Sequence, residues 1–462
     1  MGMDFSGFYS LFAITERGVS MNQNYMKEKP VLSLVLSMSL PMVISMLVNA
    51  LYNIVDSFYV AKISENAMTA VSLVYPIQNL ISALAIGFGI GVNVVISIAL
   101  GAGKKEKADQ ALCQGLLLSL VHGFVCMFIC SFIMPKFLGM FTSDKEIMEY
   151  ALEYANVVFM FSVSFSLAMV CEKVFQAVGR MKTSMIALLS GCILNIVLDP
   201  MMIFGFGPIP AMGIKGAALA TGLGQTLQFV IYAVVYLFND IGLHMKRNLF
   251  FKSGNCVKEM YGTGIPATLN LALPSVLITA LNGILATVSE QGILILGIYY
   301  KLQTFLYLTT NGFVQGMRPL VGYNYGAKEY KRVKKIIMDV LLLSSVVMVI
   351  GTLICVVNPQ SLMGLYTTNQ KTIELGSVAL RIISAGFIIS GISCTITGAL
   401  EGLGKGLPSL MISLLRYIII MIPSAFILAK IMGVNGVWMA FPVTEVISAI
   451  LSFVIYKRFA RM

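Results

Sequence analysis

Apolar runs long enough to cross a membrane account for most of this chain. About 20 predominantly apolar residues span a bilayer as a helix, and only 11% of the residues are charged, against about 25% in a soluble domain. The runs lack the strict polar and apolar alternation of outer-membrane strands. We therefore predict an all-α integral membrane protein with twelve transmembrane helices. The predicted spans are 37–61, 67–100, 111–134, 148–171, 183–206, 212–238, 262–288, 292–325, 336–357, 376–399, 408–429 and 434–456.

The second half of the chain repeats the first at a spacing of 225 residues. The matching pairs include Gly87 and Gly312, Gly91 and Gly316, Gly101 and Gly326, Pro41 and Pro266, and Gln78 and Gln303. Each half holds six predicted spans, and an even number returns the chain to the same side of the membrane. Two parallel repeats of this kind are typical of transporters with a site near the repeat interface.

The repeat divides the chain into four parts. We predict a cytoplasmic N-terminal tail over 1–36, a first lobe over 37–238, a cytoplasmic linker over 239–261, and a second lobe with a short cytoplasmic tail over 262–462. A matching pair of loops, which begin at Gly101 and Gly326, ends one long span in each half. These loops are either gates or simple helix ends followed by topology-setting lysines.

The net charge of +11 is distributed loop by loop. If the amino terminus lies inside, most Lys and Arg residues fall in inner segments, as the positive-inside rule requires. We expect a multi-pass protein of the cell inner (plasma) membrane with both termini in the cytoplasm. Membrane lipid is then a partner and nucleic acid is not. No signal peptide precedes the first span, and Met1, Met21 and Met26 are alternative starts.

Sequence motifs for nucleotides, metals and catalysis do not match this chain. Gly101-Ala-Gly-Lys104 lacks the first glycine and the Ser/Thr of a phosphate loop, and Gly87-Phe-Gly-Ile-Gly91 lies inside an apolar span. The two histidines, His122 and His244, are far apart. We therefore expect no enzyme activity and no cofactor, and we expect transport to run on an ion gradient.

Asp56 is the first acid placed inside a predicted span. A carboxylate at the bilayer centre costs about 2.5–3.5 kcal/mol on insertion scales and marks a functional site by default. Asn49 and Asn53 precede it by seven and three residues, on the same helical face. These three residues are candidates for ion coupling or substrate binding. The alternative is an acid at the outer mouth, because the span ends near Ala61.

Asp199 is another acid inside a predicted span. Asn195 lies four residues earlier on the same face, and Pro200 follows. A proline frees a backbone carbonyl one turn back, which can bind a cation or water. Thr221 in the next span and Gln78 in the second span are further candidates for the same site. The alternative is a Pro-bent helix end with a solvated Asp.

The second half does not repeat these acids. Leu281 stands opposite Asp56, and the stretch opposite Asp199 has no acid. Lys301, Arg318 and Arg416 occupy second-half spans instead. We therefore expect ion coupling in the first lobe. In the second lobe we expect a cavity wall whose charge differs from that of the first lobe. The candidates for a second-lobe cavity are Asn270, Asn282, Gln303 and Glu445.

Several motifs together resemble the multidrug and toxic compound extrusion (MATE) transporters. They include Val55-Asp-Ser-Phe-Tyr-Val60, Asn195-Ile-Val-Leu-Asp-Pro200, Gly213-Ile-Lys-Gly-Ala-Ala-Leu-Ala-Thr221 and Gln315-Gly-Met-Arg-Pro319. The resemblance covers nearly the whole chain after about residue 35.

The resemblance implies two six-helix lobes in a V that open alternately to each side. It implies a monomer that exports small organic, often cationic, compounds in exchange for protons or sodium ions. In a first-lobe-acid (DinF-like) subgroup the ion site corresponds to Asp56, Asn195, Asp199 and Thr221, so a sodium ion at these residues is one option. Another subgroup uses an acid in the seventh span, and residues 262–288 have none. A lipid-linked precursor flippase of the same superfamily is the alternative, because Lys301, Arg318 and Arg416 suit phosphates.

Overall fold

The computed structural model describes residues 24–460, and within them it is an all-α protein. A short helix, α2 (Tyr25–Glu28), precedes the first lobe. The first lobe comprises α3 (Val31–Ala61), α4 (Glu65–Gly101), α5 (Lys105–Leu138), α6 (Lys145–Met160), α7 (Ser162–Ala177), α8 (Met181–Phe204) and α9 (Gly213–Phe238). The second comprises α10 (Cys256–Ala286), α11 (Glu290–Gly326), α12 (Tyr330–Val357), α13 (Pro359–Gly364), α14 (Gln370–Ser384), α15 (Phe387–Gly402), α16 (Gly406–Leu414), α17 (Ile422–Met432) and α18 (Val434–Phe459).

The predicted membrane spans correspond to helices of the structure. Ten described spans are long and apolar enough to cross a membrane, and the number reaches twelve if two bent pairs each form one span. The pairs are α6 with α7, bent by 47°, and α14 with α15, bent by 51°. The breaks fall at Phe161 and Gly386, which are 225 residues apart. The bend is therefore a feature of the repeated scaffold.

One helix end and one internal turn differ from the hydrophobicity pattern. Helix α3 begins at Val31, directly after Pro30, rather than near residue 37. The eleventh span contains a π-helical turn, Leu415–Met421, between α16 and α17. Such turns are rare, occur mostly inside α-helices and are frequent at functional sites. Of the alternative starts, Met1 and Met21 lie outside the described residues, whereas Met26 lies in α2.

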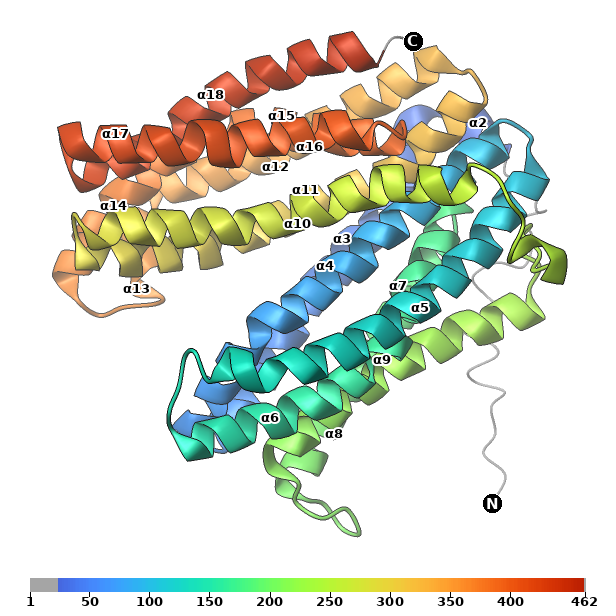
Figure 1. The fold of residues 1–462 in the computed structure, drawn as a ribbon. Coiled ribbons are helices and arrows are strands. Elements are labelled where there is room, and N and C mark those ends of the chain that lie inside the picture. Colours follow the sequence, from blue (N-terminus) through green and yellow to red (C-terminus); the bar gives the residue numbers. More distant parts are fainter. Residues whose placement is uncertain (1–23, 461–462) are drawn as a thin grey trace.

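The two lobes form a V (Figure 1). They approach each other at the end where α2 lies and diverge towards the end where α6 and α13 lie. At the narrow end α3 packs against α11 and α4 packs against α10. The repeated glycines make this contact close: a Cβ at Gly87 would lie 2.7 Å from Thr268 Cα, and one at Gly312 would lie 2.7 Å from Val43 Cα. These glycines serve helix packing, as small residues do in membranes.

Polar contacts also join the lobes at this end. The Ser39 hydroxyl donates to the Phe313 carbonyl oxygen (3.3 Å), and Lys173 Nζ donates to Gln315 Oε1 (3.0 Å). Lys107 Nζ and Glu259 Oε2 form an ion pair at 2.6 Å. The structure therefore holds the lobes together at the end that the charge pattern predicts to be cytoplasmic.

Candidate functional site

A buried polar cluster lies between α8 and α9 in the first lobe. Asn195 Nδ2 donates to Asp199 Oδ1 and to Thr221 Oγ1, both at 3.3 Å. Asp199 is fully buried, and Asn195 and Thr221 are nearly so. The helices approach closely because Gly191 and Gly224 face each other, and a Cβ on either would lie 2.7 Å from the other's carbonyl oxygen. Three of the predicted residues therefore meet in one site.

Asp56 lies on α3, which packs against α8. The two carboxyl groups are near enough to interact electrostatically. Asp56 Oδ1, Asn195 Oδ1 and Asp199 Oδ2 are all buried without a hydrogen-bond partner. Within residues 24–460 neither acid forms an ion pair with a Lys, Arg or His side chain. An uncompensated carboxylate is costly in a low-dielectric interior, so this cluster is suited to take up a cation or a proton.

Two tyrosines that the sequence interpretation missed complete the surroundings of the acids. Tyr52 and Tyr154 both lie within electrostatic reach of Asp56 and Asp199. The Tyr154 hydroxyl is hydrogen-bonded to the side chain of Gln78, which links that predicted residue to the site. Tyr52 precedes Asp56 by one helical turn, a spacing that sequence alone could have found. Tyr154 comes from α6, and nothing in the sequence connects it to the acids.

The asparagines before Asp56 bond to each other rather than to the acid. Asn53 Nδ2 donates to the Asn49 carbonyl oxygen at 2.7 Å and to Asn49 Oδ1 at 3.2 Å. Asn53 is exposed and Asn49 is half-buried. They form a polar stripe on α3 that leads to Asp56.

In the second lobe Asn270 belongs to a separate network. Its Nδ2 donates to Glu401 Oε1 and to Ser409 Oγ, both at 2.9 Å. Arg318 Nε donates to Glu401 Oε2 at 2.8 Å. Glu401, for which the sequence suggests no role, is thus the buried centre of an ion-paired network that joins α10, α11, α15 and α16.

Glu445 is also ion-paired. Arg416, from the π-helical turn, donates to Glu445 Oε1 from Nε at 3.1 Å and also from Nη2. Both side chains are buried. Asn282 and Gln303 are half-buried, and their side chains make no hydrogen bond within the described part of the chain. The second-lobe candidates therefore do not gather into one site.

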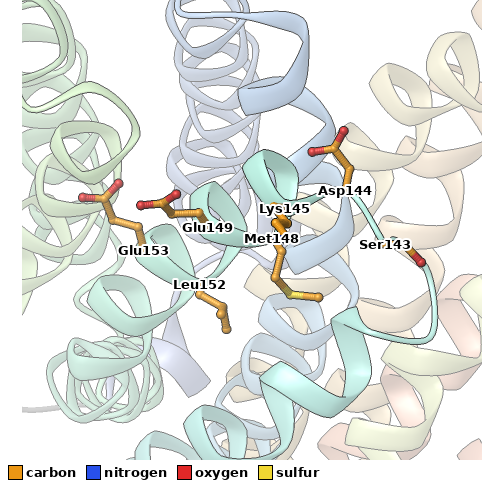
Figure 2. A pocket seen from close by; sticks show the side chains of 7 residues that line it. All are labelled: Ser143, Asp144, Lys145, Met148, Glu149, Leu152 and Glu153. Atoms are coloured by element: carbon orange, nitrogen blue, oxygen red, sulfur yellow. The ribbon is translucent and has the colours of Figure 1, made fainter.

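A hollow of about 660 Å³ lies on the surface where α6 begins. Figure 2 shows its lining, which includes the carboxylates of Asp144, Glu149 and Glu153. All of it comes from one stretch, residues 143–153, and these three acids are exposed. The hollow is separate from the buried cluster. Across residues 24–460, no three His, Cys, Asp or Glu side chains gather as a metal site would need.

Comparison with known proteins agrees with this architecture. The family model described as MatE matches residues 41–201 and 266–427, one stretch in each lobe. This chain belongs to the MatE family. It is a multi-pass membrane transporter and not an enzyme.

The similar proteins extend over nearly the whole chain. The multidrug export protein MepA of Staphylococcus aureus (strain N315) is 26% identical over 432 residues, 93% of this chain and 94% of MepA. MepA of Staphylococcus haemolyticus (strain JCSC1435) is 26% identical over 435 residues, 94% of this chain and 95% of that protein.

Two solved structures share the fold. One is the outward-facing conformation of a multidrug resistance MATE family transporter of the MOP superfamily (TM-score 0.89, 23% identity, 95% of this chain and 98% of that one). The other is a MOP superfamily transporter from Pyrococcus furiosus, described as having a binding pocket of reverse polarity that suggests a different function (TM-score 0.88, 23% identity, 95% and 98%). The shared fold therefore does not by itself decide what is carried.

Proposed function

We propose that this transporter exports organic, cationic compounds in exchange for protons or sodium ions. Relatives that match more than nine-tenths of the chain are named multidrug export proteins, which supports multidrug efflux. The observation that carries the coupling proposal is Asp199, a fully buried acid with one oxygen that has no partner. Only a bound cation or a proton can neutralise such a group without moving it.

The first lobe holds the coupling site in this proposal. Asp56 and Asp199 provide the charge, and Asn195 and Thr221 provide further oxygen atoms and the hydrogen bonds that orient Asp199. The same oxygens could receive a proton or a sodium ion, because hard cations prefer oxygen ligands. When the ion enters, the acids become neutral and a cationic compound that had paired with them is released.

This arrangement supports membership of the first-lobe-acid (DinF-like) subgroup, which we include in the proposal. The membrane part of α10 has no acid, and Glu259, at its exposed start, pairs with Lys107. A flippase with a basic cavity is not favoured. Arg318 and Arg416 are already neutralised by Glu401 and Glu445, so they are not free to bind phosphates.

The test is efflux of a cationic dye from vesicles with a pH gradient and a sodium gradient imposed separately. We expect one of the two gradients to drive efflux in the wild type. Asp199→Asn should reduce efflux to the level without a gradient, because a neutral amide can neither take up and release a proton nor attract a sodium ion by its charge. Glu153→Gln is the matched control, since it neutralises an exposed acid in the same lobe (Figure 2) and should keep full activity. Full gradient-driven efflux by both Asp56→Asn and Asp199→Asn would refute the proposal.

A further inference from the structure

A second hollow, of about 310 Å³, lies between the lobes at their narrow end. Its floor is apolar, with Val94, Val95 and Ile98 from α4 and Leu403 from the turn before α16. Its charged lining consists of Lys104, Lys107 and Glu259, and Glu259 pairs with Lys107, so Lys104 carries the unpaired charge. The volume equals that of about ten water molecules, which fits a small charged group with the first part of an apolar chain.

The repeat gives this hollow a counterpart on the other side of the molecule. At an offset of 225, Lys107 corresponds to Arg332 and Gly404 corresponds to Gly179. In the counterpart, Met26 of α2 is completely buried, and a Cβ at Gly179 would lie 2.5 Å from Met26 Cε. The counterpart is therefore filled by an apolar side chain.

The filled counterpart also shows which polar groups bind at its edge. Arg332 Nη2 donates to the Lys29 carbonyl oxygen at 2.7 Å, and Asn324 Nδ2 donates to the Met26 carbonyl oxygen at 3.2 Å. The occupant thus combines an apolar group with oxygen atoms that face a base. The same combination would satisfy the hollow beside Lys104 and Lys107.

Residues 24–460 do not fill the second hollow. Phe251 is the repeat partner of Met26, yet it is 85% exposed. The linker that carries it is held against α5, where Gln114 Nε2 and Gln110 Nε2 donate to the Lys252 carbonyl oxygen at 2.7 Å and 3.1 Å. The hollow is thus left open by the described part of the chain.

We propose that this hollow binds an anionic phospholipid of the adjacent leaflet. The phosphate would lie against Lys104, which forms no ion pair within residues 24–460, and against Lys107, which shares its charge with Glu259. The first part of an acyl chain would cover Val95 and Ile98. Because both lobes line the hollow, a bound lipid stabilises their contact at this end. The proposal does not depend on which ion or compound is transported.

The test is native mass spectrometry of the purified protein with added phosphatidylglycerol or phosphatidylcholine. We expect the wild type to retain one phosphatidylglycerol in preference to phosphatidylcholine. Lys104→Ala should weaken this binding about fivefold, as expected for one base near a membrane surface. Lys105→Ala is the matched control, because Lys105 is exposed in the same turn but does not line the hollow, and its effect should be much smaller.

Four results would overturn the proposal. Equal losses in Lys104→Ala and Lys105→Ala would show that the lipid is held by general surface charge. Equal retention of the two lipids would show that the phosphate charge is not recognised. If Phe251→Ala raised lipid binding tenfold or more, the linker itself would be the normal occupant. Inorganic phosphate is added in a separate arm: displacement of the lipid at equal concentration would show that the acyl chain contributes nothing.

Discussion

Replacing Gly312 with alanine should open the contact between the lobes at their narrow end. The new Cβ would lie 2.7 Å from Val43 Cα, which is backbone and cannot rotate away. Ordinary carbon contacts begin near 3.4 Å, so α3 and α11 must separate by about 0.7 Å. Overpacking of this kind costs about 1–3 kcal/mol, which shifts a two-state equilibrium by about 5–150-fold.

Cross-linking between the lobes measures this shift. Cysteines at Lys107 and Glu259, the interlobe ion pair, are joined by a short bifunctional maleimide in a cysteine-free background. We expect the cross-linking rate to fall in the Gly312→Ala protein. Gly297→Ala is the matched control, because Gly297 lies on the same helix and its Cβ would meet nothing within 4 Å. Unchanged cross-linking in Gly312→Ala, with unchanged thermal stability, would refute the packing argument.

Three further outcomes follow from the contacts. Thr221→Val removes one hydrogen bond from Asn195. It should weaken binding of the coupling ion about fivefold, since such a bond contributes about 1 kcal/mol. Transport measured at increasing ion concentration tests this, and an unchanged midpoint would count against the cluster as the ion site. Arg318→Ala leaves the buried Glu401 without its ion-pair partner and should destabilise the protein by about 3–5 kcal/mol. The double variant Arg318→Ala with Glu401→Gln should regain part of this stability in thermal unfolding. Equal melting temperatures of the single and double variants would contradict the role of the ion pair. Arg332→Ala removes one hydrogen bond from the Met26 carbonyl and one from the Lys29 carbonyl and should speed proteolysis before α3. An unchanged cleavage rate would show that these two bonds do not hold α2.

The scaffold could be predicted from the sequence because it depends on local patterns. Apolar length located the spans, and the spacing of Asn195 and Asp199 placed both on one helical face. The start of α3 at Val31 was missed because hydropathy does not register the stop that Pro30 imposes. The bends at Phe161 and Gly386 were missed because the hydropathy of an apolar segment is the same whether its helix is straight or bent.

The electrostatic surroundings could be predicted only in part. The buried bases of the second lobe suggested a cavity wall, but Arg318 and Arg416 each find an acid on another helix. Such pairs join residues 83 and 29 positions apart, and no single-helix pattern reveals them. Tyr154 reaches the acids of the first lobe for the same reason, through the packing of α6 against its neighbours.

The central claim is that the ion and the exported compound compete through Asp199. Its most direct test is equilibrium binding of a cationic dye to the purified protein, measured as proton and sodium concentrations are varied in turn. We predict that dye affinity falls as one of these ions is raised, and that Asp199→Asn removes this dependence. A wild-type affinity that responds to neither ion, or a variant that keeps the full response, would contradict the account.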